Sequence, residues 1–444
     1  MVFLGDKVSK EKKEQIFYIA VVCILNILFF FFIGDKGTLF EKDSSTYIKW
    51  SYLGIKRGYT LYPWFLKAIR SIHGEETYLT MIPVYQGAIS IVSNCILVEY
   101  CRKRYSAGMI AGLFMHLFIL APYTYTLPDA VSSHYVLTEG LSIPLFHVSV
   151  FLLLKGVIDR SNRNAVASVL LGVMLFLLRP QLFIISAIYV SVIIIYTVYL
   201  RIQNKKSFLY ITVVVLTLIF IVGVCTYFKI ISGWANSKTN SQLIEATTGK
   251  ALCLLKEEDS GFYSGLDRDI YLDLLNDGKK KGRLTEAFPR SLLDYESLHK
   301  IINENVTAHE TLIWDHYISV RGDDGGESAY LTRNLITSTE ILNHKMEYIG
   351  IILRLMPSSL VASVFFQPPG IRLICYIFTG ILYVVAFCMN CILIRKRVNE
   401  IYILPGLIVH IIIFANALAC NVLLYGQQRY VIYCMGVFYI SMLI

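Results

Sequence analysis

Two residues four positions apart, Asp43 and Tyr47, are the first side chains in this sequence that could do chemistry. In a short helix, that spacing places both on one face. Tyr62 and Trp64 follow in the same segment, so aromatic side chains accompany the carboxylate. A carboxylate held at a membrane surface beside aromatic residues can accept a proton from a hydroxyl group and so act as a general base. The alternative is a solvated loop acid with aromatic anchors at the membrane interface.

A second group of ionisable residues, Asp129, His134 and Glu139, precedes a later apolar run. Glu139 stands where that run begins, and an ionisable group facing lipid there would be costly, so we expect it to face a cavity. Asp129 and His134 could ligate a metal ion, but one histidine and one aspartate make a weak set. We therefore predict no metal site here and expect His134 to lie on the surface.

Two arginines, Arg179 and Arg429, each stand at the end of an apolar run, and Tyr430 follows the second. Guanidinium groups bind phosphate through paired hydrogen bonds, so two that converge could hold a lipid-linked phosphate. The alternative is that both reach out to lipid headgroups. Carboxylates, arginines and an aromatic-rich loop together suit a substrate with a polar head and a lipid tail. An ion pathway would instead place charges in the middle of helices.

The composition of the chain indicates which structural elements position these residues. The chain has 444 residues, of which 55% are hydrophobic and 16% are charged. Apolar runs of about 20 residues recur, which is the length of a helix that crosses a bilayer. We predict an all-α polytopic membrane protein with ten spanning helices, at 16–33, 78–99, 107–122, 137–154, two within 165–200, 208–230, 372–394, 401–424 and 431–444.

Short basic clusters between these runs predict the topology, because Lys and Arg in short loops stay in the cytoplasm. With all of them on that side, both termini are cytoplasmic and the candidate site residues are extracytoplasmic. The net charge of +9 then reflects topology and contact with anionic membrane lipids, not nucleic-acid binding. The clusters are Lys7/Lys10/Lys12/Lys13, Arg102/Lys103/Arg104, Lys155/Arg160/Arg163, Arg201/Lys205/Lys206 and Arg395/Lys396/Arg397.

Three parts of the chain follow from this pattern. Residues 1–230 form an N-terminal transmembrane module that carries the first outer loop. Residues 231–370 are polar with apolar periodicity, which predicts a small helical extracytoplasmic domain. Its last segment, 344–366, should be a re-entrant or interfacial helix, since a spanning helix there would place the last basic cluster outside. Residues 371–444 supply the C-terminal transmembrane helices.

A resemblance to a known family rests on motifs that occur in the family's order. The spacing Asp43-x-x-x-Tyr47, followed by Gly58 and Tyr62-Pro63, resembles the first loop of GT-C glycosyltransferases. The group it resembles is the dolichyl-phosphate-mannose-protein mannosyltransferase-like (family 39-like) bacterial enzymes. Later motifs also resemble that group, over 16–230 and 372–444: the segment from Glu139 to Pro144, the Arg179-Pro180 turn and the pair Arg429-Tyr430.

The resemblance implies an inverting transfer of a sugar from a polyprenyl-phosphate donor to a glycan, lipid or protein acceptor on the outer face. It implies that Asp43 is the general base and that Arg429, with Arg179, stabilises the departing phosphate. Asp129 or Glu139 would orient a substrate. Three aromatic residues would shape the site: Tyr47, Tyr62 and Trp64. One departure is that Gln427 and Gln428 stand where the family often has an acid before the late Arg-Tyr pair.

Some GT-C enzymes use a divalent metal ion, and no residue here requires one, so we predict no certain cofactor. Two other functions stay open. A polysaccharide polymerase or ligase would rely on paired arginines and depend less on Asp43. A lipid-linked sugar transporter or flippase would show two related halves with interrupted helices at matching positions. The broken run at 165–200 has no counterpart in the second half of the chain.

Overall fold

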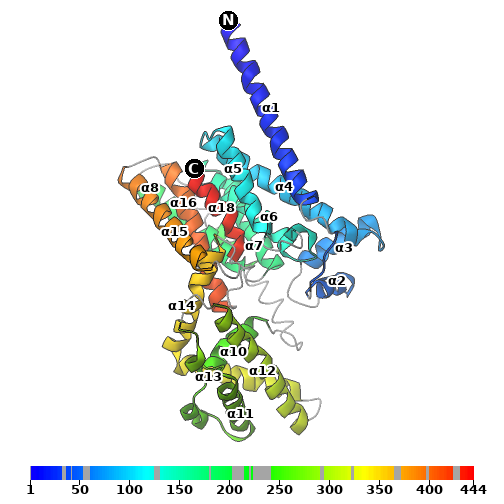
Figure 1. The fold of residues 1–444 in the computed structure, drawn as a ribbon, viewed down its shortest axis with the longest axis vertical. Helices are drawn as coiled ribbons and strands as arrows, with labels where there is room; N and C mark the ends of the chain where they lie inside the picture. Colours follow the sequence, from blue (N-terminus) through cyan, green and yellow to red (C-terminus); the bar gives the residue numbers. More distant parts are fainter. Residues whose placement is uncertain are drawn as a thin grey trace. The chain divides into compact units, whose positions relative to one another are not determined.

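The structure, a computed structural model, is helical almost throughout (Figure 1). Among the described residues, the only β-bridge is an isolated parallel one between Leu39 and Tyr135. The predicted all-α fold is therefore confirmed. The structure describes residues 2–32, 37–41, 43–53, 61–124, 131–179, 182–202, 215–219, 222–223, 242–290, 295–321, 325–364, 372–396, 400–423 and 431–444.

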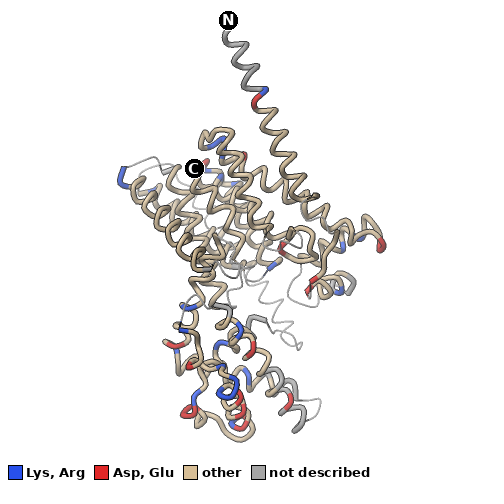
Figure 2. The backbone as a smooth tube through the Cα atoms, in the orientation of Figure 1, with Lys and Arg blue, Asp and Glu red and all other residues tan. Residues whose placement is uncertain are grey.

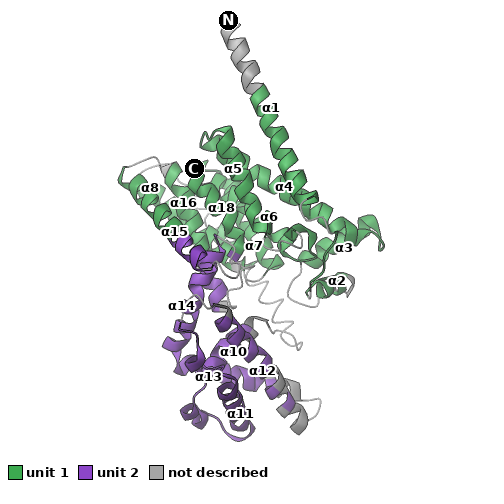
Figure 3. Cartoon of the chain, in the orientation of Figure 1, with its two compact units in different colours: residues 1–228, 381–413, 432–444 green, residues 229–380, 414–431 purple. Residues whose placement is uncertain are grey.

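The chain divides into two compact units (Figure 3). Unit 1 comprises residues 1–228, 381–413 and 432–444, and unit 2 comprises residues 229–380 and 414–431. Charged residues are sparse along the described helices of unit 1 and frequent along α10 to α13 of unit 2 (Figure 2). Unit 1 therefore has the composition of a membrane bundle.

Nine described helices match predicted spans, which makes this a multi-pass membrane protein. Three are apolar but shorter than a full span: α5 (Met109–Leu120), α7 (Asn162–Leu178) and α18 (Met435–Leu443). The tenth prediction, 208–230, falls largely outside the described residues. Six are long and apolar enough to cross a bilayer: α1 (Val2–Phe31), α4 (Tyr78–Arg104), α6 (Glu139–Ile158), α8 (Phe183–Ile202), α15 (Arg372–Arg395) and α16 (Glu400–Leu423).

Helices α4 and α6 run in the same direction, which gives unit 1 two distinct ends. At one end, Arg104 Nε lies 3.0 Å from Asp159 Oδ1, just past α6. At the other, the Gln86 side-chain amide donates to the carbonyl oxygen of Tyr135 over 3.0 Å, just before α6. We call the first the basic end, because it gathers two of the basic clusters, and the second the site end.

Other described clusters lie at the basic end as well. The rings of Tyr105 and Tyr402 are 5.7 Å apart, which places the start of α16, and so the cluster that closes α15, at this end. Helix α8 packs antiparallel to α7, with Gly172 against Ser186, so its final Arg201 also returns to the basic end.

The turn between α6 and α7 is tight because of a glycine. A Cβ atom added to Gly156 would lie 2.7 Å from the backbone nitrogen of Ala165. Because Gly156 has no side chain, α6 and α7 can pack closely, beginning at the basic end. The close packing brings the end of α7 next to the start of α6 at the site end.

Five helices and three short 3₁₀ turns lie entirely within the described part of unit 2. Aromatic and aliphatic side chains form its core, with Tyr271, Ile270 and Ile336 fully buried. Unit 2 is thus a compact helical unit, with bounds that differ from the predicted 231–370. Its last helix, α14, is not among the six apolar candidates for spans within the described chain. The helices are α10 (Gln242–Ala251), α11 (Gly265–Lys281), α12 (Tyr295–Arg321), α13 (Gly325–Asn343) and α14 (Lys345–Ala362).

A buried lysine joins α10 to the end of α16 within unit 2. Lys250 is fully buried, and its ammonium donates to the carbonyl oxygens of Asn421 and Val422, each over 2.7 Å. These are carbonyls of the last helical turn, which lack partners inside the helix. Burial lowers the pKa of Lys250 to about 7, and a neutral amine still has two hydrogens for the two carbonyls.

The lysine predicts a pH dependence of stability. Because its folded pKa of about 7 lies below the ordinary value, the unfolded chain binds more protons above pH 7. Stability therefore rises between pH 7 and 9, by up to about 1.4 kcal/mol per pH unit. We expect the thermal midpoint of wild type to rise over this range relative to that of Lys250→Met. If the thermal midpoints of wild type and Lys250→Met change by the same amount over this pH range, Lys250 does not cause the pH dependence.

Candidate active site

A buried ion pair stands at the site end of unit 1. Glu139 is the first residue of α6, and Arg179 directly follows α7. Their Oε1 and Nη1 atoms are 2.5 Å apart, and the two residues are only 1% and 5% exposed. The hydroxyl of Thr138 donates to the other carboxylate oxygen over 3.1 Å. A carboxylate at a helix N-terminus interacts favourably with the helix dipole, and the arginine compensates its burial.

A tyrosine missed in the sequence extends this pair. Tyr433 lies in the short turn η8 (Ile432–Cys434), and its hydroxyl accepts a hydrogen bond from Arg179 Nη1 over 2.8 Å. The hydroxyl of Ser142 donates to the same oxygen over 3.0 Å. Tyr433 stands inside an apolar run, where an aromatic residue is usually core. Its one signal in the sequence was its position three residues after the Arg429-Tyr430 motif.

The first loop contributes two tyrosines from neighbouring helices, α2 (Ser44–Leu53) and α3 (Leu61–His73). The rings of Tyr47 and Tyr62 meet edge to face, with centroids 5.3 Å apart, and both are buried. Burial raises the pKa of Tyr62 well above its usual value, and the nearby Tyr47 and Glu139 raise it further. Tyr62 therefore keeps its proton and remains a hydrogen-bond donor.

A buried glutamine links this loop to the start of α6. The Tyr62 hydroxyl donates to Gln86 Oε1 over 3.2 Å. The amide nitrogen of Gln86 in turn donates to the carbonyl oxygens of Ser133 and Tyr135, over 2.8 and 3.0 Å. Gln86 was not predicted as a site residue. Its polar side chain within the apolar run 78–99 was a signal that it has a buried hydrogen-bonding role. It fixes the segment that leads into Glu139.

Asp43 stands directly before α2. Its backbone carbonyl accepts hydrogen bonds from the amides of Thr46 and Tyr47, over 3.1 and 3.3 Å, so the chain turns into a helix at this residue. The residue is half-buried. The helical spacing expected between Asp43 and Tyr47 is therefore present, and the aspartate lies one turn before the buried tyrosine pair.

The prediction for His134 was wrong. It is only 3% exposed, because the segment before α6 folds into the bundle instead of lying over it as a surface loop. Its Nε2 atom lies 2.7 Å from the carbonyl oxygen of Phe30, and Nδ1 lies 3.1 Å from that of Gly37. His134 thus ties the end of α1 to the segment that carries Glu139.

The remaining predicted site residues stand apart from this network or outside the described structure. Trp64 is 52% exposed on α3, and its ring lies 5.2 Å from the Lys67 ammonium. Three further predictions lie outside the described residues: Asp129, Arg429 and Tyr430. The structure therefore brings together Tyr47, Tyr62, Glu139 and Arg179, and Asp43 lies one helical turn before Tyr47.

Within the described part of the chain, the network offers hydrogen-bond donors and one buried carboxylate. Among the described residues, the one group of three metal-ligating side chains that converge lies in unit 2. At the site end of unit 1, Arg179 supplies a buried guanidinium, and Tyr47 and Tyr62 supply buried aromatic rings. A carboxylate at Asp43 can take a proton nearby.

Comparisons with known proteins found similarity only to solved structures. No protein-family model matches the sequence, and no curated protein matches it. Two structures of ArnT from Cupriavidus metallidurans are similar, one bound to undecaprenyl phosphate and one in the apo state. They are 10% and 12% identical, and the similarity covers 96% of this chain and 77% and 78% of theirs, with a TM-score of 0.36 for both. A TM-score this low does not establish a shared fold.

Proposed function

We propose that this protein is a membrane glycosyltransferase. It moves a sugar from a polyprenyl-phosphate donor to a hydroxyl of a cell-surface glycan, lipid or protein. The observation that carries the proposal is the ion pair of Glu139 and Arg179, buried at the site end among tyrosines from the first loop. An arginine held this rigidly is suited to a phosphate, because its planar guanidinium has five donors in fixed directions.

The residues have distinct roles in the proposed reaction. Asp43 takes the proton from the acceptor hydroxyl as that oxygen attacks the anomeric carbon of the sugar. The bond between this carbon and the phosphate oxygen breaks, and the phosphate leaves with the electron pair, so the configuration inverts. Arg179 stabilises the charge that develops on the phosphate, together with Arg429. Glu139 and Tyr433 act as positioning residues, because both contact the Arg179 guanidinium.

The basic end supports an extracytoplasmic location of the site. Lys and Arg clusters stay cytoplasmic, so the site end faces the opposite, extracytoplasmic side. A donor whose lipid tail remains in the bilayer can then present its phosphate at the membrane surface. The tyrosines, amphipathic and enriched at membrane interfaces, are suited to that depth.

The test is sugar transfer by the purified full-length protein, with a panel of polyprenyl-phosphate sugars and candidate acceptors. We expect release of free polyprenyl phosphate together with one glycosylated product. Heat-denatured protein is the control for spontaneous hydrolysis. Movement of labelled donor across proteoliposomes without any transfer would instead establish a flippase. Products of many lengths would establish a polymerase.

A further inference from the structure

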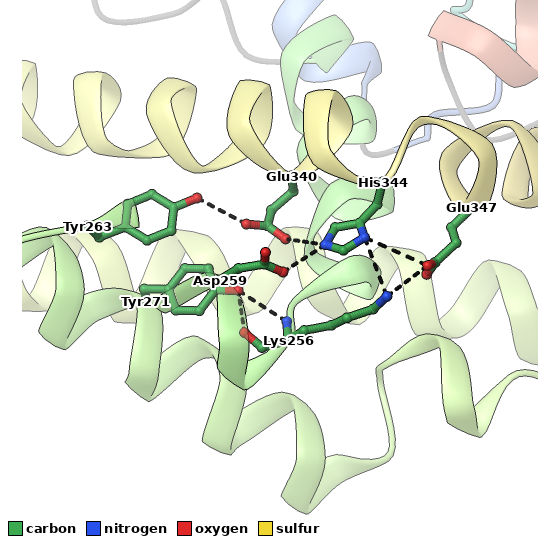
Figure 4. A network of polar contacts seen from close by, with 7 residues as sticks. All are labelled: Lys256, Asp259, Tyr263, Tyr271, Glu340, His344 and Glu347. Atoms are coloured by element: carbon green, nitrogen blue, oxygen red, sulfur yellow. Dashed lines mark hydrogen bonds and ion pairs between the residues drawn. The ribbon is translucent and has the colours of Figure 1, made fainter. Parts of the chain in front are cut away.

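Unit 2 contains a cluster of potential metal ligands that the proposed reaction does not use (Figure 4). It comprises Asp259, Glu340 and His344, one ligand atom of each lying within 4.8 Å of the others. His344 Nε2 is 2.7 Å from Asp259 Oδ2 and 3.9 Å from Glu340 Oε2. The three side chains are 7%, 0% and 11% exposed, in that order. One imidazole nitrogen and two carboxylates thus converge away from bulk water.

The two oxygens of Glu340 differ in how they are satisfied. Oε1 accepts a hydrogen bond from the Tyr263 hydroxyl over 3.0 Å. Oε2 is buried and accepts none from the described residues, although it points toward His344 (Figure 4). A buried carboxylate oxygen without a hydrogen bond is costly.

The three ligands come from a 3₁₀ turn and from the end of a helix. Glu340 lies in the last turn of α13, and His344 follows four residues later, with its amide bonded to the Glu340 carbonyl over 2.9 Å. Residues four apart in a helix share a face. Asp259 comes from the 3₁₀ turn η5 (Glu257–Phe262), which leads to Tyr263, whose ring stacks on that of Tyr271 with centroids 4.6 Å apart.

A carboxylate is also positioned for the second nitrogen of the histidine. A metal-bound imidazole usually donates its other N–H to a carboxylate or a carbonyl. Glu347 Oε1 lies 3.7 Å from His344 Nδ1, and the Lys256 ammonium lies 2.7 Å from that oxygen and 3.4 Å from Nδ1. When a metal ion takes Nε2 and the imidazole proton moves to Nδ1, that proton faces the Glu347 carboxylate once the Lys256 ammonium has turned away from Nδ1.

We propose that Asp259, Glu340 and His344 bind one divalent transition-metal ion of the zinc type, with water completing its coordination. Zinc bonds to imidazole nitrogen and carboxylate oxygen are about 2.0–2.2 Å long, so tetrahedral ligand atoms stand about 3.2–3.6 Å apart. The present separations of 2.7 and 3.9 Å lie on either side of that range. Imidazole favours zinc over magnesium and calcium, which prefer oxygen ligands. The ion would tie η5 to the end of α13.

The experiment is a zinc titration of the full-length protein after treatment with a chelator, followed by calorimetry and by thermal unfolding. We expect one high-affinity ion per chain and a higher thermal midpoint with zinc. Glu340→Gln, which keeps the side-chain volume, and His344→Gln should each weaken binding by about 100-fold or more, since loss of outer-shell partners alone costs about 10–100-fold. The Glu347→Gln variant should fall within that smaller range.

Glu257→Gln is the matched control, because this carboxylate lies in the same turn η5 and is 80% exposed. It should bind zinc like wild type. Elution profiles on size exclusion verify that each variant is folded. Cobalt distinguishes the site from the free cysteines, since thiolate ligation gives an intense near-ultraviolet band that a nitrogen and oxygen site lacks. Equal zinc affinity of wild type and Glu340→Gln, or a thiolate band at the first equivalent, would overturn the proposal.

Discussion

Replacing Asp43 with asparagine should lower the rate of sugar transfer by about 10²- to 10⁴-fold, the usual contribution of a general base. Asparagine keeps the size of the side chain and its preference for the position before a helix, so α2 should still begin directly after this residue. The loss should appear in kcat more than in KM, because the proton is taken in the transition state. The measurement is the transfer assay with purified wild type and Asp43→Asn.

Glu41→Gln is the control for that prediction. It removes another carboxylate of the same loop, from an exposed residue two positions earlier. Transfer by this variant should stay within about twofold of wild type, as expected for a surface substitution away from the site. Equal activity in Asp43→Asn and wild type would assign the base elsewhere. Asp129 and Glu139 would then be the next carboxylates to test.

The apolar runs were sufficient to predict the helices, because a bilayer demands both length and low polarity in each span. Helix positions for α4, α6 and α16 differ from the predicted ranges only near their ends, where polar residues continue the helix. α4, for example, continues to Arg104, five residues past the predicted end. Hydropathy describes the membrane core and does not determine where the helix ends.

Residues that depend on tertiary contacts could not be predicted in the same way. His134 looks like a surface histidine in sequence, and it is buried because two carbonyls from the end of α1 and the following loop reach it. Gln86 and Tyr433 became part of the site through partners about 50 and more than 250 residues away. The spacing rules of helices and strands do not extend to such distances.

The same limit applies to unit 2. Glu340 and His344 are four apart, which a helical pattern would reveal, but their third partner is Asp259, about 80 residues earlier. The acidic run 257–259 resembles a solvated surface in sequence. Only the fold shows that Asp259 is buried while its neighbour Glu257 is exposed.

Removing Arg179 should affect both stability and transfer. Arg179→Gln leaves Glu139 buried without its cation, which typically destabilises a protein by about 3–5 kcal/mol. Transfer should fall by about 10²- to 10³-fold, the usual cost of losing a donor that stabilises developing charge. The measurements are the thermal midpoint in detergent and the transfer assay, with substrate at saturation so that kcat is compared.

The ion pair of Arg104 and Asp159 at the basic end is a matched control. Their side chains are 32% and 33% exposed, so solvent screens the pair more than it screens the buried one. Arg104→Gln should cost less than about 1 kcal/mol and leave transfer unchanged. A larger loss of transfer in this variant than in Arg179→Gln would place the reaction at the other end of unit 1.

A double variant separates the structural role of Arg179 from its role in the reaction. In Glu139→Gln with Arg179→Gln, two amides replace the two charges, so no unpaired charge stays buried and most of the stability should return. Transfer should stay low, because the guanidinium that faces the phosphate is still absent. If transfer returned with stability, Arg179 would serve only to neutralise Glu139. The phosphate would then have to be held by Arg429 alone.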